Sequence, residues 1–134
     1  MAKLTVEVVT PEKRILSMQV DEAVVPGGDG LFGVRPGHTA FLSLMEPGVL
    51  TLVSENGTRR DRFFVSGGFV EVGNDVVRVL ADGAEPVAGI DVEAARRRLS
   101  DASERLKALA VADARHALEQ ATVRRETARI AAAG

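Results

Sequence analysis

The chain has 134 residues, enough for one ordinary domain and an appendage. The absence of cysteine excludes a disulfide framework, a thiolate metal site and a cysteine nucleophile, and a net charge of −2 gives no reason to expect nucleic acid as a partner. No apolar run approaches the ~20 residues that span a bilayer, and a strand pattern starts already at Leu4, so we expect a soluble protein without a signal peptide.

The first two thirds of the chain has the pattern of short β-strands. Residues 4–9 alternate apolar and polar side chains with a period of two, as a half-buried strand does. The pattern returns in further segments: residues 15–25 (one or two strands), 49–53, 62–72 and 76–80. Turn signals rich in glycine or asparagine occur at residues 55–57, 67–68 and 73–75. This spacing indicates a sandwich or barrel of antiparallel strands.

Residues 26–33 are rich in glycine but match no nucleotide-binding loop. A P-loop needs lysine and then serine or threonine after its last glycine, and here Val34 and Arg35 follow. Pro36 blocks the helix that a dinucleotide-binding fingerprint requires. We therefore expect these glycines to serve tight turns, and we interpret His38 as a turn residue. The five phenylalanines are expected to fill the core: Phe32, Phe41, Phe63, Phe64 and Phe69.

The composition changes abruptly at Ile90. Twelve of the thirteen glycines and all the prolines and phenylalanines precede it, whereas the stretch to Ala133 has neither glycine nor proline. We therefore expect a β module at residues 1–89 and a helical unit at residues 90–134. The first carries 8 basic and 12 acidic side chains, and the second carries 9 and 7.

The helical unit is predicted to be a hairpin. Asp91 is expected to cap a first helix, since its carboxylate can accept hydrogen bonds from first-turn amides. Its narrow apolar stripe comprises Val92, Ala95, Leu99, Ala102, Leu106 and Leu109. A second helix is predicted from a cap near Asp113 to about Ile130, with a poorer stripe: Ala114, Leu118, Ala121, Arg125 and Ala128. The connection at residues 110–113 lacks glycine and proline, so one long helix also stays open.

Arginines recur along the second helix with few neighbouring acids: Arg115, Arg124, Arg125 and Arg129. They form either a solvated face or a surface that meets an acidic partner. His116 lies among these charges and is interpreted as solvated. No pattern of residues singles out a metal or catalytic site.

Five segments are together more specific than any one alone: Val8-Val9-Thr10-Pro11-Glu12, Gly30-Leu31-Phe32-Gly33-Val34-Arg35-Pro36-Gly37-His38, Pro47-Gly48-Val49-Leu50, Val65-Ser66-Gly67-Gly68-Phe69-Val70-Glu71-Val72 and Val79-Leu80-Ala81-Asp82. With these segments and its Ala- and Arg-rich tail, the chain closely resembles the epsilon subunit family of bacterial F-type ATP synthases. The resemblance covers residues 4 to about 109 in motif and the whole chain in layout.

The resemblance implies an α+β protein, with an N-terminal antiparallel β-sandwich of about ten strands and a C-terminal α-helical hairpin. It implies a non-catalytic rotor subunit that docks on the gamma subunit, stands on the c-subunit ring and couples proton-driven rotation to ATP synthesis. The implied location is peripheral, on the cytoplasmic face of the bacterial inner membrane. In many members the helices extend toward the alpha/beta head and inhibit ATP hydrolysis.

The resemblance also assigns roles to particular residues. A loop near the ring would comprise Asp29, Gly30, Leu31, Phe32 and His38. When the helices extend, the candidates for contacts with acidic beta-subunit surface are Arg115, Arg124, Arg125 and Arg129.

Two segments depart from the family pattern. The family's Gly-His-Ala-Pro-Leu-Leu is here Gly37-His38-Thr39-Ala40-Phe41-Leu42, which alters the local loop. Of the ATP-binding motif Ile-Asp-x-x-Arg-Ala, Ile90, Asp91 and Ala95 match, but Ala94 replaces the arginine. Arg96 lies about 200° further round the helix. This argues against ATP as a regulatory ligand, and no other cofactor or metal is expected.

Two other functions stay open. The chain could be a free-standing β-sandwich binding module with a dimerising helical hairpin. A small hydrolase would rest only on scattered acids and one histidine.

Overall fold

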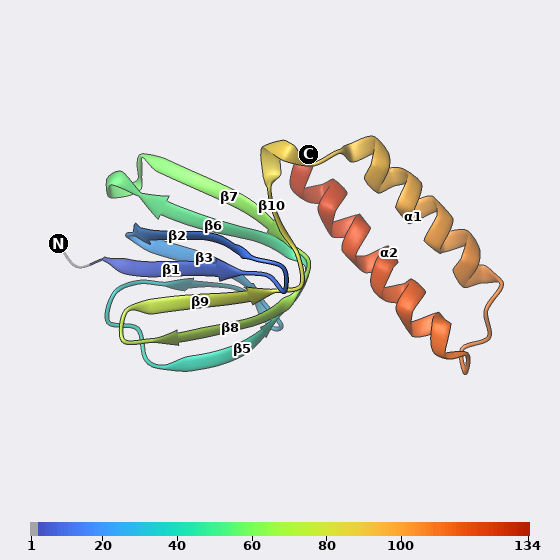
Figure 1. The fold of residues 1–134 in the computed structure, drawn as a ribbon, viewed down its shortest axis with the longest axis horizontal. Helices are drawn as coiled ribbons and strands as arrows, with labels where there is room; N and C mark the ends of the chain where they lie inside the picture. Colours follow the sequence, from blue (N-terminus) through green and yellow to red (C-terminus); the bar gives the residue numbers. More distant parts are fainter. Residues whose placement is uncertain (1–2) are drawn as a thin grey trace. The chain divides into compact units, whose positions relative to one another are not determined.

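The computed structural model describes residues 3–134 and divides into two compact units, Met1–Val87 and Ala88–Gly134. The first unit is made of strands and the second of two helices (Figure 1). The division falls two residues before the one suggested by composition.

The first unit contains ten strands: β1 (Leu4–Val9), β2 (Arg14–Val20), β3 (Glu22–Gly27), β4 (Gly30–Val34), β5 (Phe41–Met45), β6 (Gly48–Ser54), β7 (Arg59–Val65), β8 (Gly68–Gly73), β9 (Val76–Ala81) and β10 (Ala84–Pro86). The predicted strand segments are all present. The glycine-rich segment is more than a turn, because its second half forms β4 and pairs with β3 around a tight turn at residues 28–29.

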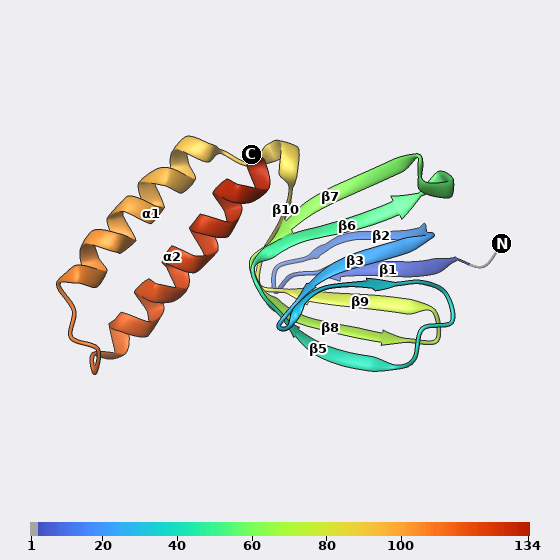
Figure 2. The ribbon, with the colours of Figure 1, turned by 180° about the vertical axis from the view of Figure 1, so that it is seen from behind.

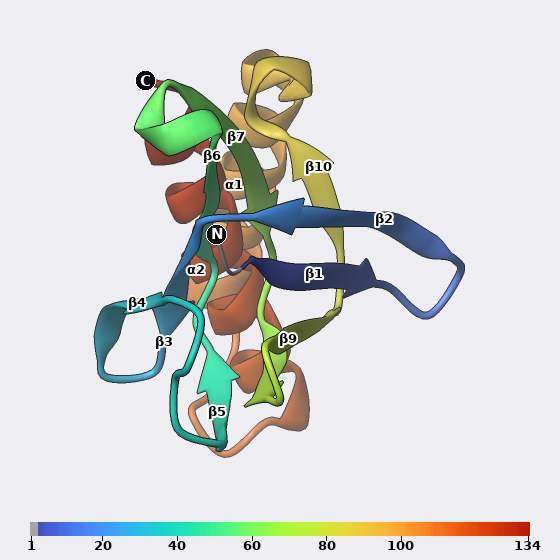
Figure 3. The ribbon, with the colours of Figure 1, turned by 90° about the vertical axis from the view of Figure 1, so that its left-hand side faces the viewer.

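The strands pair in the order β10-β7-β6-β3-β5-β8-β9-β1-β2, and β4 adds to β3. All pairs are antiparallel except β1 with β9, which is parallel. The neighbours β5, β8 and β9 are visible from both sides in Figures 1 and 2, and the β3–β4 hairpin is seen end-on beside β5 in Figure 3. The predicted sandwich of about ten strands is confirmed.

The core of this unit is built mainly from valine and leucine, as the alternating pattern requires. The prediction for the phenylalanines is right only in part. Phe64 is buried, and Phe32 and Phe63 pack on the core cluster, but Phe41 and Phe69 are 43% and 49% exposed. Successive side chains of a strand point to opposite faces. Phe69 therefore lies on the exposed face of β8 with Glu71, while Val70 and Val72 face the core.

The second unit consists of α1 (Val92–Lys107) and α2 (Ala114–Ala133). The predicted caps are both present: Asp91 Oδ1 accepts from the Ala94 N–H at 3.0 Å, and Asp113 Oδ1 accepts from the Arg115 N–H at 2.9 Å. The helices are separate and in contact with each other, so this structure has the hairpin and not the single long helix.

The predicted stripe of α2 is wrong for its first three residues, whereas Arg125 and Ala128 are half-buried. Ala114, Leu118 and Ala121 are exposed, and Leu118 is 69% exposed. The fully buried residues of α2 are instead Glu126 and Ala132. A hydropathy pattern predicts the wrong buried face for α2, because the largest buried side chain of this helix is the carboxylate-bearing Glu126.

Candidate functional site

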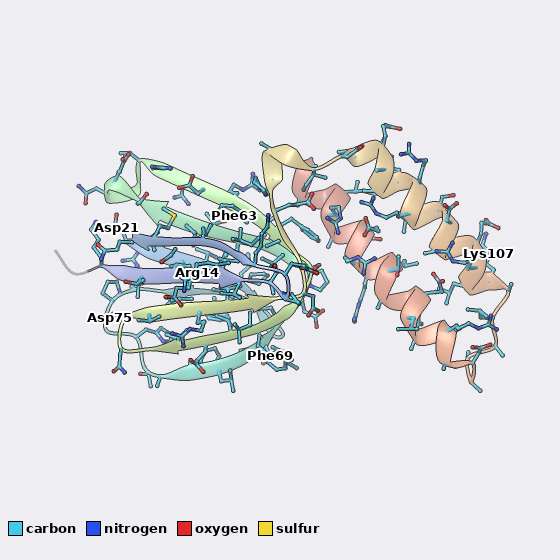
Figure 4. The ribbon with its side chains drawn as sticks, viewed as in Figure 1. Arg14, Asp21, Phe63, Phe69, Asp75 and Lys107 are labelled. Carbon is cyan, nitrogen blue, oxygen red and sulfur yellow. The ribbon has the colours of Figure 1, made fainter. Side chains whose placement is uncertain are left out.

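An exposed apolar row crosses three neighbouring strands of the first unit. Leu44 of β5 lies opposite Phe69 of β8, which lies opposite Leu80 of β9. Directly opposed residues point to the same face of a sheet, and these three are 61%, 49% and 43% exposed. Leu42, two residues along β5 from Leu44, extends the row and is 66% exposed. Phe69 is labelled in Figure 4. Contiguous exposed apolar side chains of this kind mark a binding surface.

A charged row runs beside the apolar one. Arg78 of β9 lies between Glu7 of β1 and Glu71 of β8, and it donates to both. Its Nε lies 3.3 Å from Glu7 Oε2, and its Nη1 lies 3.0 Å from Glu71 Oε1. The apolar surface therefore has a polar border with a defined arrangement of charge, as protein interfaces commonly do.

The residues assigned to the ring-proximal loop lie together. Asp29, Gly30, Leu31, Phe32 and His38 all line one shallow pocket. Phe41 connects them, since its ring packs edge-on against Phe32 with centroids 5.2 Å apart and lies 6.2 Å from the His38 ring. Leu31 at the hairpin is 70% exposed. Phe32 and His38 are apart in the sequence, but both rings lie against Phe41 of β5, which brings them together.

One hydrogen bond ties the loop before β5 to another segment, and a second lies within the loop. The Gly37 N–H donates to Asp75 Oδ1 at 2.7 Å, which ties the loop to the β8–β9 turn (Asp75 is labelled in Figure 4). His38 Nδ1 lies 2.7 Å from its neighbour's carbonyl, Thr39 O. His38 is thus a residue of an ordered turn, and its ring stays on the surface near Phe41.

The residues that match the family's nucleotide motif serve the start of α1. Asp91 uses its carboxylate as the helix cap, Ala95 is buried, and Ile90 is half-buried. Ala94 offers no charged group to a phosphate. Because Asp91 caps the helix, its presence at this position requires no bound nucleotide.

Three of the four arginines on α2 are paired within the chain, so the expectation of few neighbouring acids is wrong for them. Arg115 forms two side-chain hydrogen bonds with the cap residue Asp113, at 3.1 and 2.8 Å. The hydrogen bond from Arg115 lowers the pKa of Asp113. Arg124 is exposed and, among residues 3–134, has no acidic partner.

Arg125 and Arg129 meet at Glu126. Arg125 Nε donates to Glu126 Oε2 at 2.9 Å, and Arg129 donates to both carboxylate oxygens, at 3.1 and 3.4 Å. Arg98 of α1 donates to Oε1 at 2.9 Å across the hairpin. The Glu126 side chain is 0% exposed. Burial by itself raises the pKa of Glu126, but hydrogen bonds from Arg125 and Arg98 and the charge of Arg129 outweigh it and lower the pKa.

A second pair crosses between the helices. Arg105 of α1 donates to Glu119 Oε1 of α2 at 2.7 Å. This pair is wetter than the first, with side-chain exposures of 56% and 19%. The two crossing pairs together join one face of α1 to the inner face of α2.

Neither helix within residues 3–134 is long and apolar enough to cross a membrane. The same residues contain no group of three or more histidine, cysteine or acidic side chains arranged to hold a metal ion.

The fold and its surfaces define a β-sandwich domain joined to a helical hairpin, with an exposed apolar surface of the kind that binds other proteins. The family model described as ATP synthase, Delta/Epsilon chain, beta-sandwich domain matches residues 3–87. The chain is 74% identical over 133 residues to the ATP synthase epsilon chain of Myxococcus xanthus, covering 99% of this chain and 96% of that protein. It is 49% identical over 131 residues to that of Anaeromyxobacter sp. (strain K), covering 98% of each. The chain belongs to the ATP synthase delta/epsilon family.

Two solved structures share the fold. A chain of the Euglena gracilis mitochondrial ATP synthase, in a structure of OSCP, F1 and the c-ring, superposes with a TM-score of 0.83 at 24% identity, covering 98% of this chain and 82% of that one. A chain of the Tetrahymena thermophila central stalk and c-ring gives 0.62 at 17% identity, covering 96% and 97%. The two-part architecture is thus shared with distant proteins.

Sequence reasoning missed the apolar row and Glu126. For the row, a signal was present: in the segment Phe69-Val70-Glu71-Val72, the period of two places Phe69 on the side of Glu71. For Glu126, the signal was a repeat of seven residues, with arginines at 98 and 105 and glutamates at 119 and 126.

Proposed function

We propose that this chain is the non-catalytic epsilon subunit of a bacterial proton-translocating F-type ATP synthase, placed in the rotating central stalk. Its β-sandwich docks on the gamma subunit and stands on the c-subunit ring, coupling ring rotation to ATP synthesis in the alpha/beta head. The complex holds it at the cytoplasmic face of the inner membrane. The near full-length identity to bacterial ATP synthase epsilon chains supports this assignment.

The docking face on gamma is the apolar row Leu44–Phe69–Leu80, and this row is the observation on which the proposal depends. A monomeric protein gains nothing from three large apolar side chains lined up on solvent. Burial of the row stabilises a complex by about 25 cal/mol per Å² of apolar surface removed from water. The adjoining Glu7–Arg78–Glu71 row supplies the polar rim that fixes orientation.

The test is binding of purified gamma by the F69D variant. An aspartate in the middle of the row places a charge in the buried interface, so we expect the Kd to rise at least about 30-fold, the loss of a typical hot spot. V111D is the matched control, because Val111 is 83% exposed but lies in the connection between the helices. Wild-type affinity in F69D, with intact folding, would remove the row from the proposal. No binding of gamma by the wild-type chain would remove the assignment itself.

The ring-proximal surface is the pocket around Asp29, Gly30, Leu31, Phe32 and His38. Leu31 is its most exposed apolar side chain, and it lies at the end of a hairpin whose Gly28 N–H donates to Leu44 O at 3.1 Å. The L31D variant is expected to weaken association with the c-ring while leaving gamma binding intact. Equal loss of both would mean that this loop is part of the gamma surface.

The helical hairpin inhibits ATP hydrolysis when α2 leaves α1 and extends toward the head. Its arginines then face acidic beta-subunit surface. Truncation after Leu109 is expected to raise ATP hydrolysis by the reconstituted enzyme, and unchanged hydrolysis would argue against inhibition by α2.

Single substitutions can separate the arginines. Arg124 is exposed and uncommitted, whereas Arg115 is held by the cap residue Asp113. R124Q is therefore expected to relieve inhibition more than R115Q. The opposite order would show that the cap pair opens in the inhibited enzyme.

A further inference from the structure

The two helices are joined by charge as well as by apolar packing. The buried residues of α1 and α2 are three alanines, Ala95, Ala102 and Ala132, together with Glu126. Each alanine offers one methyl group, worth about 0.8 kcal/mol when buried. The one large side chain of the two helices that is completely buried is therefore that of Glu126, and half-buried apolar residues such as Leu99 and Leu106 add to the packing.

The crossing ion pairs also determine the register of the hairpin. Arg98 and Arg105 are seven residues apart on α1, and Glu119 and Glu126 are seven apart on α2, so both pairs fit one antiparallel arrangement. Sliding α2 by seven residues in either direction keeps only one pair. In one direction the slip also sets Glu126 opposite Asp91, which is unfavourable for two like charges.

We propose that Glu126 closes the α1–α2 hairpin: its buried carboxylate bridges Arg98 of α1 to Arg125 and Arg129 of α2, and loss of its negative charge opens the hairpin. The closing role depends only on these contacts. Its regulatory consequence, that Glu126 controls how readily α2 becomes available to the head, rests on the proposed function.

The direction of the effect follows from the charges around the carboxylate. With Glu126 present, three guanidinium groups share one buried anion and are kept close together. Without that anion they repel one another, and Arg129, the least exposed of the three, has the least solvent to screen it. Arg125 and Arg129 belong to the same helix and move together, so separating α2 from Arg98 is the motion that relieves the repulsion. Opening also returns Arg129, whose side chain is only 14% exposed, to solvent.

Protonation does not release the hairpin near neutral pH. The surrounding arginines lower the pKa of Glu126 despite its burial, so the carboxylate stays ionised. A competing anionic surface can release it, because such a surface offers the same guanidinium groups an alternative partner. Glu126 and an acidic protein surface therefore compete for the arginines of α2.

The test measures the distance between the helices in the isolated full-length chain. Since the chain has no cysteine, S100C/Q120C places one spin label on an exposed position of each helix. Pulsed electron–electron resonance then reports the closed and open populations. In E126Q we expect the open-to-closed ratio to rise by about 150-fold or more, since removing one partner of a buried ion pair costs ~3 kcal/mol or more.

Two further variants keep the experiment decisive. E119Q is the matched control, because it removes the wetter crossing pair and is expected to change the ratio by less than about threefold. R98Q removes the cross-helix donor without altering the buried position, and it is expected to open the hairpin as well. Hydrogen exchange in β1–β9 reports that the sandwich stays folded. Wild-type distances in both E126Q and R98Q, or equal opening in E119Q, would overturn the proposal.

Hydrolysis by the reconstituted enzyme separates this inference from the proposed function. If E126Q opens the hairpin but truncation after Leu109 leaves hydrolysis unchanged, the closing role stands and the inhibitory function fails. If truncation raises hydrolysis but E126Q keeps wild-type distances, the inhibitory function stands and the role of Glu126 fails.

Discussion

Gly68 at the start of β8 is the residue at which one added methyl group is expected to do the most damage to the proposed docking face. Its φ is +127°, and a Cβ built on it would lie 2.1 Å from the carbonyl oxygen of Leu80 and 3.0 Å from Ala81 Cα. Both contacts are with the backbone of β9, so no side-chain rotation relieves them. In G68A the two strands must separate by about 1 Å, a distance that disrupts ladder hydrogen bonds.

The cost can be divided between backbone strain and the clash. A non-glycine residue in this region of φ costs about 1–3 kcal/mol, and weakening one or two hydrogen bonds adds about 1 kcal/mol each. We therefore expect G68A to lower the free energy of unfolding of the sandwich by about 2–5 kcal/mol. The apolar row is affected too, because Phe69 and Leu80 pair immediately beside this contact.

G30A is the matched control for G68A. Gly30 has a similar φ of +117°, but a Cβ there meets nothing within 4 Å, so G30A pays only the backbone strain, about 1–3 kcal/mol. The chain has neither tryptophan nor tyrosine, so urea unfolding is followed by far-UV circular dichroism, with hydrogen exchange of β8 and β9 peptides to separate the sandwich from the helices. If the two variants differ by less than about 1 kcal/mol, the clash with Leu80 is not the dominant cost.

Three further predictions concern the caps, acid stability and nucleotide. D91A removes the cap that accepts from the Ala94 N–H and is expected to destabilise α1 by about 1 kcal/mol, seen as faster exchange in its first turn; unchanged exchange would mean that water replaces the cap without cost. The pKa of Asp21 is lowered by its hydrogen bonds from Lys3 and from the Asn56 N–H. Its carboxylate thus stabilises the folded state above the ordinary pKa of 3.8, and that contribution disappears as the pH falls through the lowered value. Acid unfolding of D21N is therefore expected to show a weaker dependence on pH in this range, and a dependence equal to wild type would refute the assignment. Because Ala94 stands where the nucleotide motif has arginine, calorimetry is expected to detect no tight ATP binding, and micromolar binding would contradict this.

Much of the fold could be predicted because it depends on local chemistry. The period of two in residues 4–9 defines β1, and the acids at 91 and 113 begin the two helices where capping physics places them. The residues that the resemblance assigns to a ring-proximal loop lie in one pocket, held together by packing through Phe41, and their place near the ring stays a prediction.

The faces were harder to predict, since they depend on partners distant in sequence. Phe69 was expected in the core for its size, yet its position along β8 turns it to the surface beside Leu44 and Leu80. Glu126 was overlooked for its charge, yet it lies at the centre of the hairpin. Hydropathy assigns a carboxylate to solvent unless its counter-charges are known, and here one of them, Arg98, is on the other helix.

The sequence by itself thus determined the division into a β module and a helical unit, the start of each helix and the family to which the chain is similar. All of these depend on neighbouring residues or on the order of short motifs. Only the tertiary structure decided which side chains share a surface, because strand pairing aligns the apolar row and helix pairing brings Arg98 of α1 to Glu126 of α2. A side chain's exposure is a property of what packs against it, and those contacts join residues far apart in the chain.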